Sequence, residues 1–282
     1  MSRSLEYALR RVVPSISRLT YNPIVKVLLR AADIFPGGLW KEFRTLPPNY
    51  MRCRVGVGNR LFTNQVVFLT RGYSDWMYAL EQGHVRLDSD IVEIGCGCGR
   101  LTRQIAEYRL RGSIYSGKYL GIDIDKEMID WCEAHFDDRF EFALSTHGST
   151  SYIPSDEKTG AYSIPRDDRS VDYVYGTSLL THLLEAEMVN YLAESARILR
   201  PRSWIYLSCF AVDRATRHAG SRHTFQHRIA NAYVESMAQP QAAVAYQSDF
   251  LVESALNAGF AFAEVQSAPG DVQHALLART PD

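Results

Sequence analysis

From Asp90 onward the chain alternates short apolar segments with amphipathic ones, and this alternation constrains the fold more than any other feature. Short apolar runs indicate strands, whereas apolar residues three or four positions apart indicate helices. Seven strands are expected, at Ile91–Ile94, Tyr119–Ile124, Phe140–Leu144, Val171–Tyr175, Trp204–Cys209, Phe260–Val265 and Ala275–Ala278. Four helices are expected among them, at Leu101–Leu110, Lys126–His135, Glu185–Leu199 and Asp249–Ala258. This order predicts an α/β fold, a doubly wound and mostly parallel sheet with helices on both faces.

Parallel sheets of this kind bind ligands at the carboxyl ends of their strands, near the point where the strand order reverses. The loops after the first five strands are therefore where a functional site is expected. Two of these loops are long, residues 145–169 and 211–247, and the second includes a short helix expected after Pro240. Long loops inside a compact domain are usually lids or binding loops. We expect these two to form a lid over an acceptor.

The N-terminal part of the chain differs from the rest. Residues 1–72 are expected to form a helical, basic extension, and residues 73–282 the main domain. Between Leu5 and Leu19 apolar residues form one stripe of a helix, which Pro14 interrupts.

A second helix in the extension has clear end signals. Asn22 can cap it, Pro23 suits its first turn, and the Pro-Gly-Gly run at 36–38 is expected to end it. An irregular basic stretch is expected to follow up to Gly72, and then a helix over Ser74–Gln82.

Charge is distributed unevenly along the chain. Residues 1–60 contain eleven Lys or Arg against three acidic residues, a net +8, which leaves −9 for the remainder. A basic helix face can dock on the acidic remainder of the same protein, or it can meet an anionic membrane surface or partner. We predict that the extension covers the ligand cleft with its basic face outermost.

Composition argues against several classes of protein. No apolar run approaches the roughly 20 residues that span a bilayer, and no apolar stretch with a cleavage site follows Arg10-Arg11, so an export signal is not expected. Five scattered cysteines are too few for a disulfide framework. The predicted location is the cytoplasm. Aromatic residues are not interleaved with basic ones as in nucleic-acid platforms, so no nucleic-acid partner is expected.

The most specific motif is IVEIGCGCGR, at Ile91–Arg100. Three alternating glycines let the backbone turn sharply and approach a ligand without a Cβ in the way. Arg100 stands where a dinucleotide-binding turn has its third glycine, which disfavours a nicotinamide oxidoreductase. Glu93, just before the turn, suits a ligand with an ammonium group better than a pyrophosphate. Cys96 and Cys98 have no second Cys/His pair at ligand spacing, so no metal site is predicted.

A second acidic residue ends the next strand, in GIDID. Asp123 could accept two hydrogen bonds from a ribose diol, each worth about 1.5–3 kcal/mol at best. Asp125 is the alternative, although its position is typical of a cap for the helix that starts at Lys126. An acidic residue at each of two neighbouring strand ends, together with the glycine turn, indicates a nucleoside-type cofactor.

The segments EIGCGCGR, LGIDIDKEMIDWC, DRSVDYVYGTSLLTHL and ARILRPRSWIYLS resemble the class I methyltransferases that use S-adenosylmethionine. The resemblance runs from about Asp90 to Arg279 and is closest to a bacterial branch associated with sugar and natural-product pathways. It implies a Rossmann-like fold and S-adenosylmethionine as cofactor. The motifs are specific for the cofactor and not for an acceptor.

The resemblance also implies roles for individual residues. The methionine part of the cofactor would be contacted by Glu93, Gly95, Cys96, Gly97 and Thr177, the ribose by Asp123, and the adenine by Ile124. Two positions depart from the family pattern. The phrase after the fifth strand is Pro201-Arg202-Ser203 instead of Pro-Gly-Gly, and Ser145 stands where an aspartate often follows the third strand.

His182, in TSLLTHLLE, follows the fourth strand and is the candidate catalytic residue. It either acts as a base beside the methyl donor or caps and packs the next helix. Related ubiquinone-pathway O-methyltransferases have acidic residues in this stretch and use them with a divalent metal. This chain has Ser178–Thr181 there, so metal dependence is not predicted.

The late loop carries His218, His223 and His227 among several arginines, and we consider His223 and His227 for binding an acidic or phosphorylated acceptor. The predicted function is O-methylation of a hydroxyl on a sugar, glycolipid or related small metabolite. Two alternatives stay open. One is an N-methyltransferase or an enzyme with a non-sugar acceptor, and the other is a methyltransferase-like binding protein without catalysis.

Overall fold

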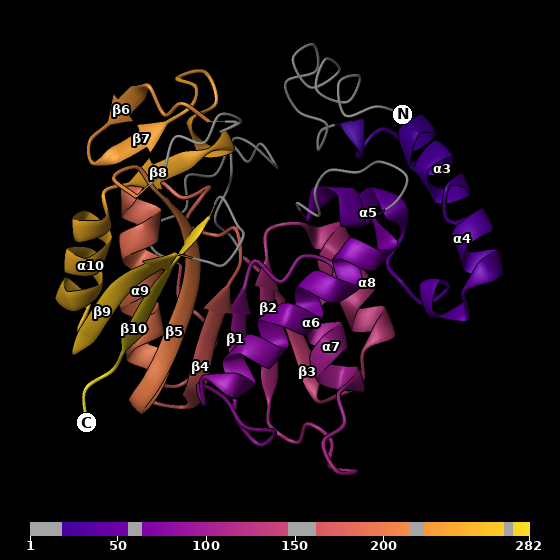
Figure 1. Cartoon of the computed structure of the whole chain (residues 1–282), viewed down its shortest axis with the longest axis horizontal. Helices are drawn as coiled ribbons and strands as arrows, with labels where there is room; N and C mark the ends of the chain where they lie inside the picture. Colours follow the sequence, from indigo (N-terminus) through magenta and orange to yellow (C-terminus); the bar gives the residue numbers. More distant parts are fainter. Residues whose placement is uncertain (1–18, 56–63, 146–161, 215–222, 268–272) are drawn as a thin grey trace. The chain divides into compact units, whose positions relative to one another are not determined.

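The computed structural model of the protein describes residues 19–55, 64–145, 162–214, 223–267 and 273–282 (Figure 1). The chain divides into two compact units, residues 1–75 and 76–282, and the division falls inside helix α6 (Gln65–Glu81). Among the described residues no helix combines the length and the apolarity needed to cross a bilayer.

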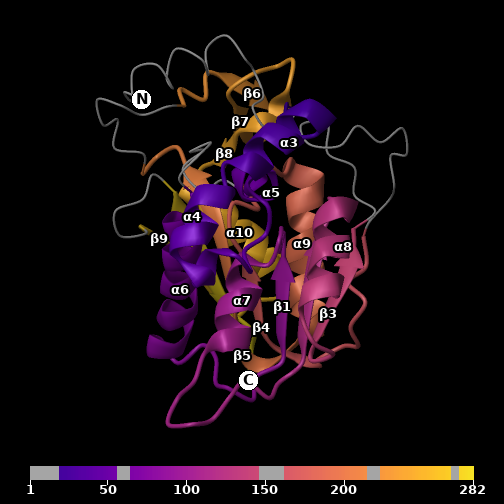
Figure 2. The ribbon, with the colours of Figure 1, turned by 90° about the vertical axis from the view of Figure 1, so that its right-hand side faces the viewer.

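The second unit is built on one mixed sheet (Figures 1 and 2). Its strand order begins β3-β2-β1-β4-β5, all parallel, so the order reverses between β1 and β4. β10 then pairs antiparallel with both β5 and β9. These strands are β1 (Ile91–Ile94), β2 (Tyr119–Asp123), β3 (Phe140–Leu144), β4 (Val171–Gly176), β5 (Leu199–Ala211), β9 (Phe262–Ser267) and β10 (His274–Arg279). The predicted Rossmann-like α/β fold and its seven strands are confirmed, with shifts of a few residues at the ends.

The prediction of one long loop over residues 211–247 is wrong where the structure describes this segment. β5 continues to Ala211, and β8 pairs in parallel with this extension, Phe210 opposite Ala245. An antiparallel hairpin follows on β8, so the described part of the sheet has ten strands. The added elements are β6 (His227–Ile229), β7 (Ala232–Val234), η2 (Pro240–Ala242) and β8 (Val244–Tyr246). Three-residue strands are too short to show a period of two, which is why the sequence pattern does not reveal them.

Helices cover both faces of the sheet, and each face has its own core. Met188 and Leu192 of α9 and Leu251 of α10 pack on one face. Trp76 of α6 and Ile105 of α7 pack on the other. The bounds are α7 (Arg100–Glu107), α8 (Lys126–His135), α9 (Glu185–Ile198) and α10 (Ser248–Asn257).

In the first unit, Asn22 caps α3 (Pro23–Ala31) as predicted, because its side-chain oxygen accepts the backbone N–H groups of Ile24 and Val25. The predicted end of this helix is wrong. The Pro-Gly-Gly run lies inside the next helix, α4 (Ile34–Leu39), with Pro36 at its third position. A proline in the first turn removes no helical hydrogen bond, since that N–H has no acceptor within the helix.

Where the structure describes it, the stretch predicted as irregular is largely helical. It contains η1 (Lys41–Phe43), α5 (Asn49–Arg54) and the start of α6 at Gln65. The predicted stripe between Leu5 and Leu19 lies almost wholly outside the described residues.

Two arginines of the basic extension are buried, so the expectation of an outward basic face is wrong for them. Arg52 is 1% exposed and donates to the Asp33 carboxylate at 2.5 Å and to the Asn64 amide oxygen at 2.8 Å. Arg54 donates to the side chain and backbone of Thr20. Because a buried guanidinium needs partners for its donors, these arginines hold the first unit together.

Candidate functional site

The glycine turn after β1 forms one side of the site. Gly95, Gly97 and Gly99 have φ angles of +79°, +55° and +78°. Side chains other than glycine rarely adopt such φ values. At Gly99 a Cβ would also lie 2.6 Å from the ring of Phe136 on the chain after α8. The backbone of the turn can therefore come close to a bound molecule, and a side chain at these positions would prevent the turn.

Asp123 lies at the end of β2 and is hydrogen-bonded to the turn. Its Oδ2 accepts the Gly97 N–H at 2.7 Å, and its Oδ1 accepts the Asp125 N–H at 2.9 Å. Each carboxylate oxygen can accept a further hydrogen bond, because it has two lone pairs. Burial raises the pKa of Asp123 to about 6 despite these bonds. Asp125 instead caps α8 by accepting the Glu127 N–H at 3.0 Å, as its position in the sequence indicated.

Glu93 is buried within β1. Its carboxylate accepts the hydroxyl of Tyr119, which in turn accepts the Thr102 hydroxyl at 2.8 Å. The negative charge of Glu93 and burial both raise the pKa of Tyr119. In the structure, Glu93 therefore belongs to a buried hydrogen-bond chain with Tyr119 and Thr102. Its contact with a methionine ammonium stays a prediction.

Two further predicted contacts lie at the same edge of the sheet. Ile124 follows Asp123 and is partly exposed. Thr177 follows β4, is also partly exposed, and its hydroxyl is bonded to that of Tyr175. The Cys96 side chain is buried toward β2, since a Cβ at Gly121 would lie 2.9 Å from its sulfur. Any contact of Cys96 with a ligand would therefore come from its backbone.

The loop after β4 reaches the glycine turn and carries His182. Leu179 lies beside the turn, 3.9 Å from the position of a Cβ on Gly95. His182 follows in the same loop, three residues before α9 begins, and its backbone N–H donates to Leu179 at 3.0 Å. The loop that carries the candidate base is therefore at the carboxyl edge of the sheet, with Leu179 as its contact to the turn.

A hydrogen-bond chain orients the His182 ring. Nδ1 lies 2.9 Å from the backbone oxygen of Gln241. Because a carbonyl only accepts, Nδ1 carries the proton in the neutral ring, and Nε2 is the basic nitrogen. The Gln241 amide donates to both Glu187 carboxylate oxygens, at 2.8 and 2.9 Å, and Glu187 also accepts the Leu184 N–H at the start of α9. The sequence analysis missed Gln241 and Glu187, and no local pattern marks either residue.

The pKa of His182 supports the role of a base. Burial lowers this pKa, the bond to Gln241 opposes the change, and the nearby His223 lowers it further. The imidazole is therefore unprotonated at neutral pH, which is the form that accepts a proton.

His223 and His227, both considered for the acceptor, lie in different surroundings. His223 packs against the rings of Phe210 and Phe225, with centroid distances of 5.3 and 5.4 Å, and the two phenylalanine rings also contact each other. Of these two histidines, His223 is the one whose charge lowers the pKa of His182. His227 is exposed on β6 opposite Val234. His218 and residues 146–161 of the predicted lid lie outside the described residues.

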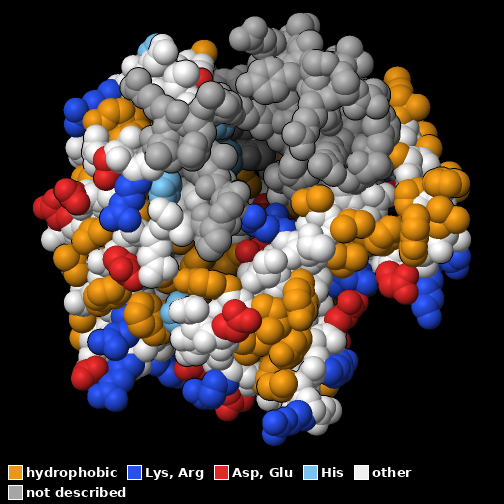
Figure 3. All heavy atoms as spheres, viewed as in Figure 1, with side chains coloured by type: hydrophobic (Ala, Val, Ile, Leu, Met, Phe, Trp, Pro, Cys, Tyr) orange, Lys and Arg blue, Asp and Glu red, His pale blue; other side chains and the backbone are white. Residues whose placement is uncertain are grey.

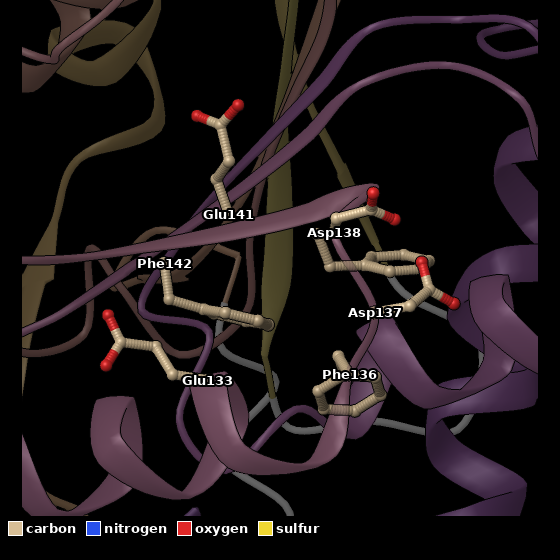
Figure 4. Close-up of a pocket in the computed structure, with 7 residues that line it drawn as sticks. Glu133, Phe136, Asp137, Asp138, Glu141 and Phe142 are labelled. Atoms are coloured by element: carbon tan, nitrogen blue, oxygen red, sulfur yellow. The ribbon is translucent and has the colours of Figure 1, made fainter.

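A surface pocket elsewhere is not part of this site. It lies between the end of α8 and the start of β3, lined by Phe136, Phe142 and acidic residues such as Glu133 (Figure 4). This is the amino end of β3, away from the carboxyl edge. The described residues contain no group of three His, Cys, Asp or Glu side chains that could hold a metal. The five cysteines are buried free thiols.

One family model matches the part of the chain that contains these strand ends. Residues 92–207 match the family model described as a methyltransferase domain, which runs from β1 through β5. The chain carries a methyltransferase domain. The methyltransferase is an S-adenosylmethionine-dependent enzyme, as the motifs after β1 and β2 indicated.

The chain is similar to solved structures of low sequence identity. A candidate O-methyltransferase from Nostoc punctiforme PCC 73102 is 14% identical with a TM-score of 0.53, and the match covers 77% of this chain and 58% of that one. A candidate exported protein from Bordetella parapertussis is 16% identical with a TM-score of 0.50, over 77% and 70%. An S-adenosylmethionine-dependent methyltransferase from Methanosarcina mazei is 18% identical with a TM-score of 0.49, over 72% and 98%.

The residues at the edge fit the cofactor chemically. A ribose diol donates two hydrogen bonds, and the Asp123 carboxylate is a partly exposed acceptor at the end of β2. The left-handed glycines keep the neighbouring space free of Cβ atoms. Asp123 and the glycine turn are thus the residues that would hold S-adenosylmethionine.

Proposed function

We propose that the methyltransferase transfers a methyl group to a hydroxyl oxygen of a sugar, glycolipid or related small metabolite. The observation that carries this proposal is the orientation of His182, whose Nδ1 is held by the Gln241 carbonyl so that Nε2 is the basic nitrogen. A hydroxyl acceptor must lose a proton during methylation, and a neutral amine does not need a base before it attacks. An oriented, unprotonated histidine therefore favours an oxygen acceptor.

Each site residue would have a separate role. When bound, S-adenosylmethionine supplies an electrophilic methyl group on a sulfonium. Asp123 would bind the ribose, the turn at Gly95–Gly97 and Thr177 would surround the methionine part, and Ile124 would contact the adenine. His182 would accept the acceptor's proton at Nε2. Alignment of the reacting atoms can lower such a barrier by about 7–11 kcal/mol, and a positioned base can add about 10²–10⁴-fold.

The acceptor would enter on the side of β6–β8. We propose that His223, which packs against Phe210 and Phe225, contacts it. The lid would be formed by residues 145–169 and by the part of 211–247 outside β6–β8. His227 is retained as a weaker candidate, since its exposed side chain would need the lid to close.

We further propose that residues 1–72 cover the main domain and that their N-terminal segment makes a peripheral contact with a membrane. The proposed location of the protein is the cytoplasm. The five buried thiols support a reducing compartment. The net charge of +8 over residues 1–60 supports an anionic surface as partner. No nucleic-acid partner is proposed.

The test is to incubate the pure protein with methyl-labelled S-adenosylmethionine and fractionated small-molecule extracts, and then to identify the labelled product. We expect a methyl ether on a hydroxyl of a saccharide or related metabolite. Label on nitrogen would replace this proposal with the N-methyltransferase alternative. Cofactor binding by calorimetry without any labelled product across the fractions would favour the non-catalytic binding protein.

A further inference from the structure

The outer side of helices α3 and α4 carries an unusually dense group of exposed apolar side chains. Seven lie within seventeen consecutive residues, each more than half exposed, and we call them the α3–α4 surface: Ile24 (71%), Val27 (68%), Leu28 (63%), Ile34 (75%), Phe35 (74%), Leu39 (57%) and Trp40 (52%). In the space-filling view, apolar side chains gather over these two helices at the right (Figure 3). Contiguous exposed apolar patches of this kind mark interaction sites.

Helical geometry puts the α3 members of this group on one stripe. Ile24, Val27, Leu28 and Ala31 are spaced by three or four positions, which places them on one face of α3. The opposite face is already used, because Leu29 is buried in the first unit. The exposed stripe is therefore not needed for the core of this unit.

Basic side chains flank the same surface. Arg30 is exposed on α3, 5.8 Å from the ring of Tyr50, and Lys41 and Arg44 are exposed beyond α4, whereas Lys26 packs over Tyr50 on the opposite face of α3. Of the two nearby acids, Asp33 is bonded to Arg52, and Glu42 is exposed. A stripe of aliphatic and aromatic residues bordered by Lys and Arg is the pattern of a helix that lies in a membrane interface.

We propose that the α3–α4 surface docks on an anionic lipid bilayer. The apolar side chains would enter the boundary between headgroups and acyl chains, with Phe35 and Trp40 at headgroup depth. Arg30, Lys41 and Arg44 would contact anionic headgroups. With nine and six residues, α3 and α4 are too short to cross the bilayer, so the contact is peripheral. This inference rests on the peripheral membrane contact proposed above, to which it gives a defined surface, and it is independent of the acceptor.

The experiment uses the full-length protein and sedimentation with vesicles of phosphatidylcholine, with or without phosphatidylserine. We expect binding to the phosphatidylserine vesicles that weakens as salt is raised. Leu28→Asp and Phe35→Asp should each lower the partition coefficient by about 10- to 100-fold, because each removes a side chain from the apolar phase. The matched control is Leu110→Asp, which changes an equally apolar residue that is 48% exposed in the second unit and should bind as the unchanged protein does.

Four outcomes would overturn the proposal. The first is absence of binding at low salt. Equal binding by the Leu28 and Phe35 variants would assign any membrane contact to another segment. Equal binding to phosphatidylcholine alone would remove the anionic headgroup from the interaction. A concentration-dependent mass in sedimentation velocity without lipid, abolished by Phe35→Asp, would instead identify the surface as a contact between two copies of the chain.

Discussion

Asp123 combines two requirements in one side chain. Its carboxylate holds the glycine turn through the Gly97 N–H, and it is also the proposed acceptor for the ribose hydroxyls. A substitution here tests both. We expect Asp123→Ala to weaken S-adenosylmethionine binding by about 10- to 150-fold in calorimetry, if about 1.5–3 kcal/mol of ribose contact is lost. Asp130→Ala, which removes an exposed partner of Lys126 on α8, should leave the affinity unchanged.

The raised pKa of Asp123, about 6, predicts a pH dependence of cofactor binding. Ribose hydroxyls donate to the ionised carboxylate, so affinity should be constant above pH 6 and fall by up to about tenfold per pH unit below it. The stability of the free protein should change with pH in the opposite direction. A raised carboxyl pKa makes folding less favourable as pH rises from about 4 to about 6. Asp123→Asn should flatten the binding curve below pH 6. A curve of unchanged shape would reject the ribose assignment.

His182 is the residue on which the proposed chemistry depends. We expect His182→Ala to reduce kcat by about 10²–10⁴-fold while cofactor affinity stays nearly unchanged. His182→Gln should not restore turnover, because an amide can hydrogen-bond but cannot take a proton. Single-turnover kinetics and calorimetry on both variants provide the check. Near-normal turnover in both would make His182 structural, and loss of cofactor binding in both would mean that it holds the loop.

At the scale of elements, the β6–β8 insertion supports the loop after β4. The Val244 N–H of β8 donates to Thr181 at 2.8 Å, and the Tyr246 hydroxyl donates to Leu183 at 2.9 Å. Together with Gln241, these bonds fix the backbone on both sides of His182. The insertion therefore holds the loop that carries His182 and is not itself a free lid.

Glu187 acts as a positioning residue in this framework, and substituting it tests that role. Glu187→Ala releases the Gln241 amide and should lower kcat by about tenfold, equivalent to roughly 1.4 kcal/mol, with a displaced pH–rate profile and unchanged cofactor affinity. Glu187→Gln keeps an acceptor for Gln241 and should retain most of the activity. If the Ala variant loses kcat without any change in the pH profile, Glu187 acts only on stability.

In the first unit, the pair Arg52–Asp33 joins α5 to the residue before α4. Asp33→Ala would leave a guanidinium that is 1% exposed without its carboxylate. We expect a loss of about 3–5 kcal/mol in the free energy of unfolding, measured by urea denaturation. Glu42→Ala, an exposed site on η1, is the matched control and should change stability by less than about 0.5 kcal/mol.

For the whole molecule, S-adenosylmethionine should raise the melting temperature, because a ligand that binds only the folded state stabilises it by mass action. NAD at the same concentration should have no effect, and the reverse result would overturn the cofactor assignment. Deleting residues 1–35 is a poor test of a covering role, since it also removes Asp33 and leaves Arg52 without its ion-pair partner. Surface variants of α3 and α4 are the better choice.

The sequence alone determined the parallel sheet, the glycine turn and Asp123, because each depends on signals within a few neighbouring residues. Alternating periodicity marks strands such as Ile91–Ile94, and positive φ angles require the glycines. Tertiary structure decided what depends on residues far apart in the chain. The three strands of the insertion form only because β5 offers an edge at Phe210, and the His182 tautomer is set by Gln241, 59 positions away. Arg52 is internal because Asp33, Asn64 and the Pro47 carbonyl accept its hydrogen bonds. Burial and pairing of this kind are invisible to a local pattern, since the same residue type is stable in water or in the interior according to the partner that the fold brings to it.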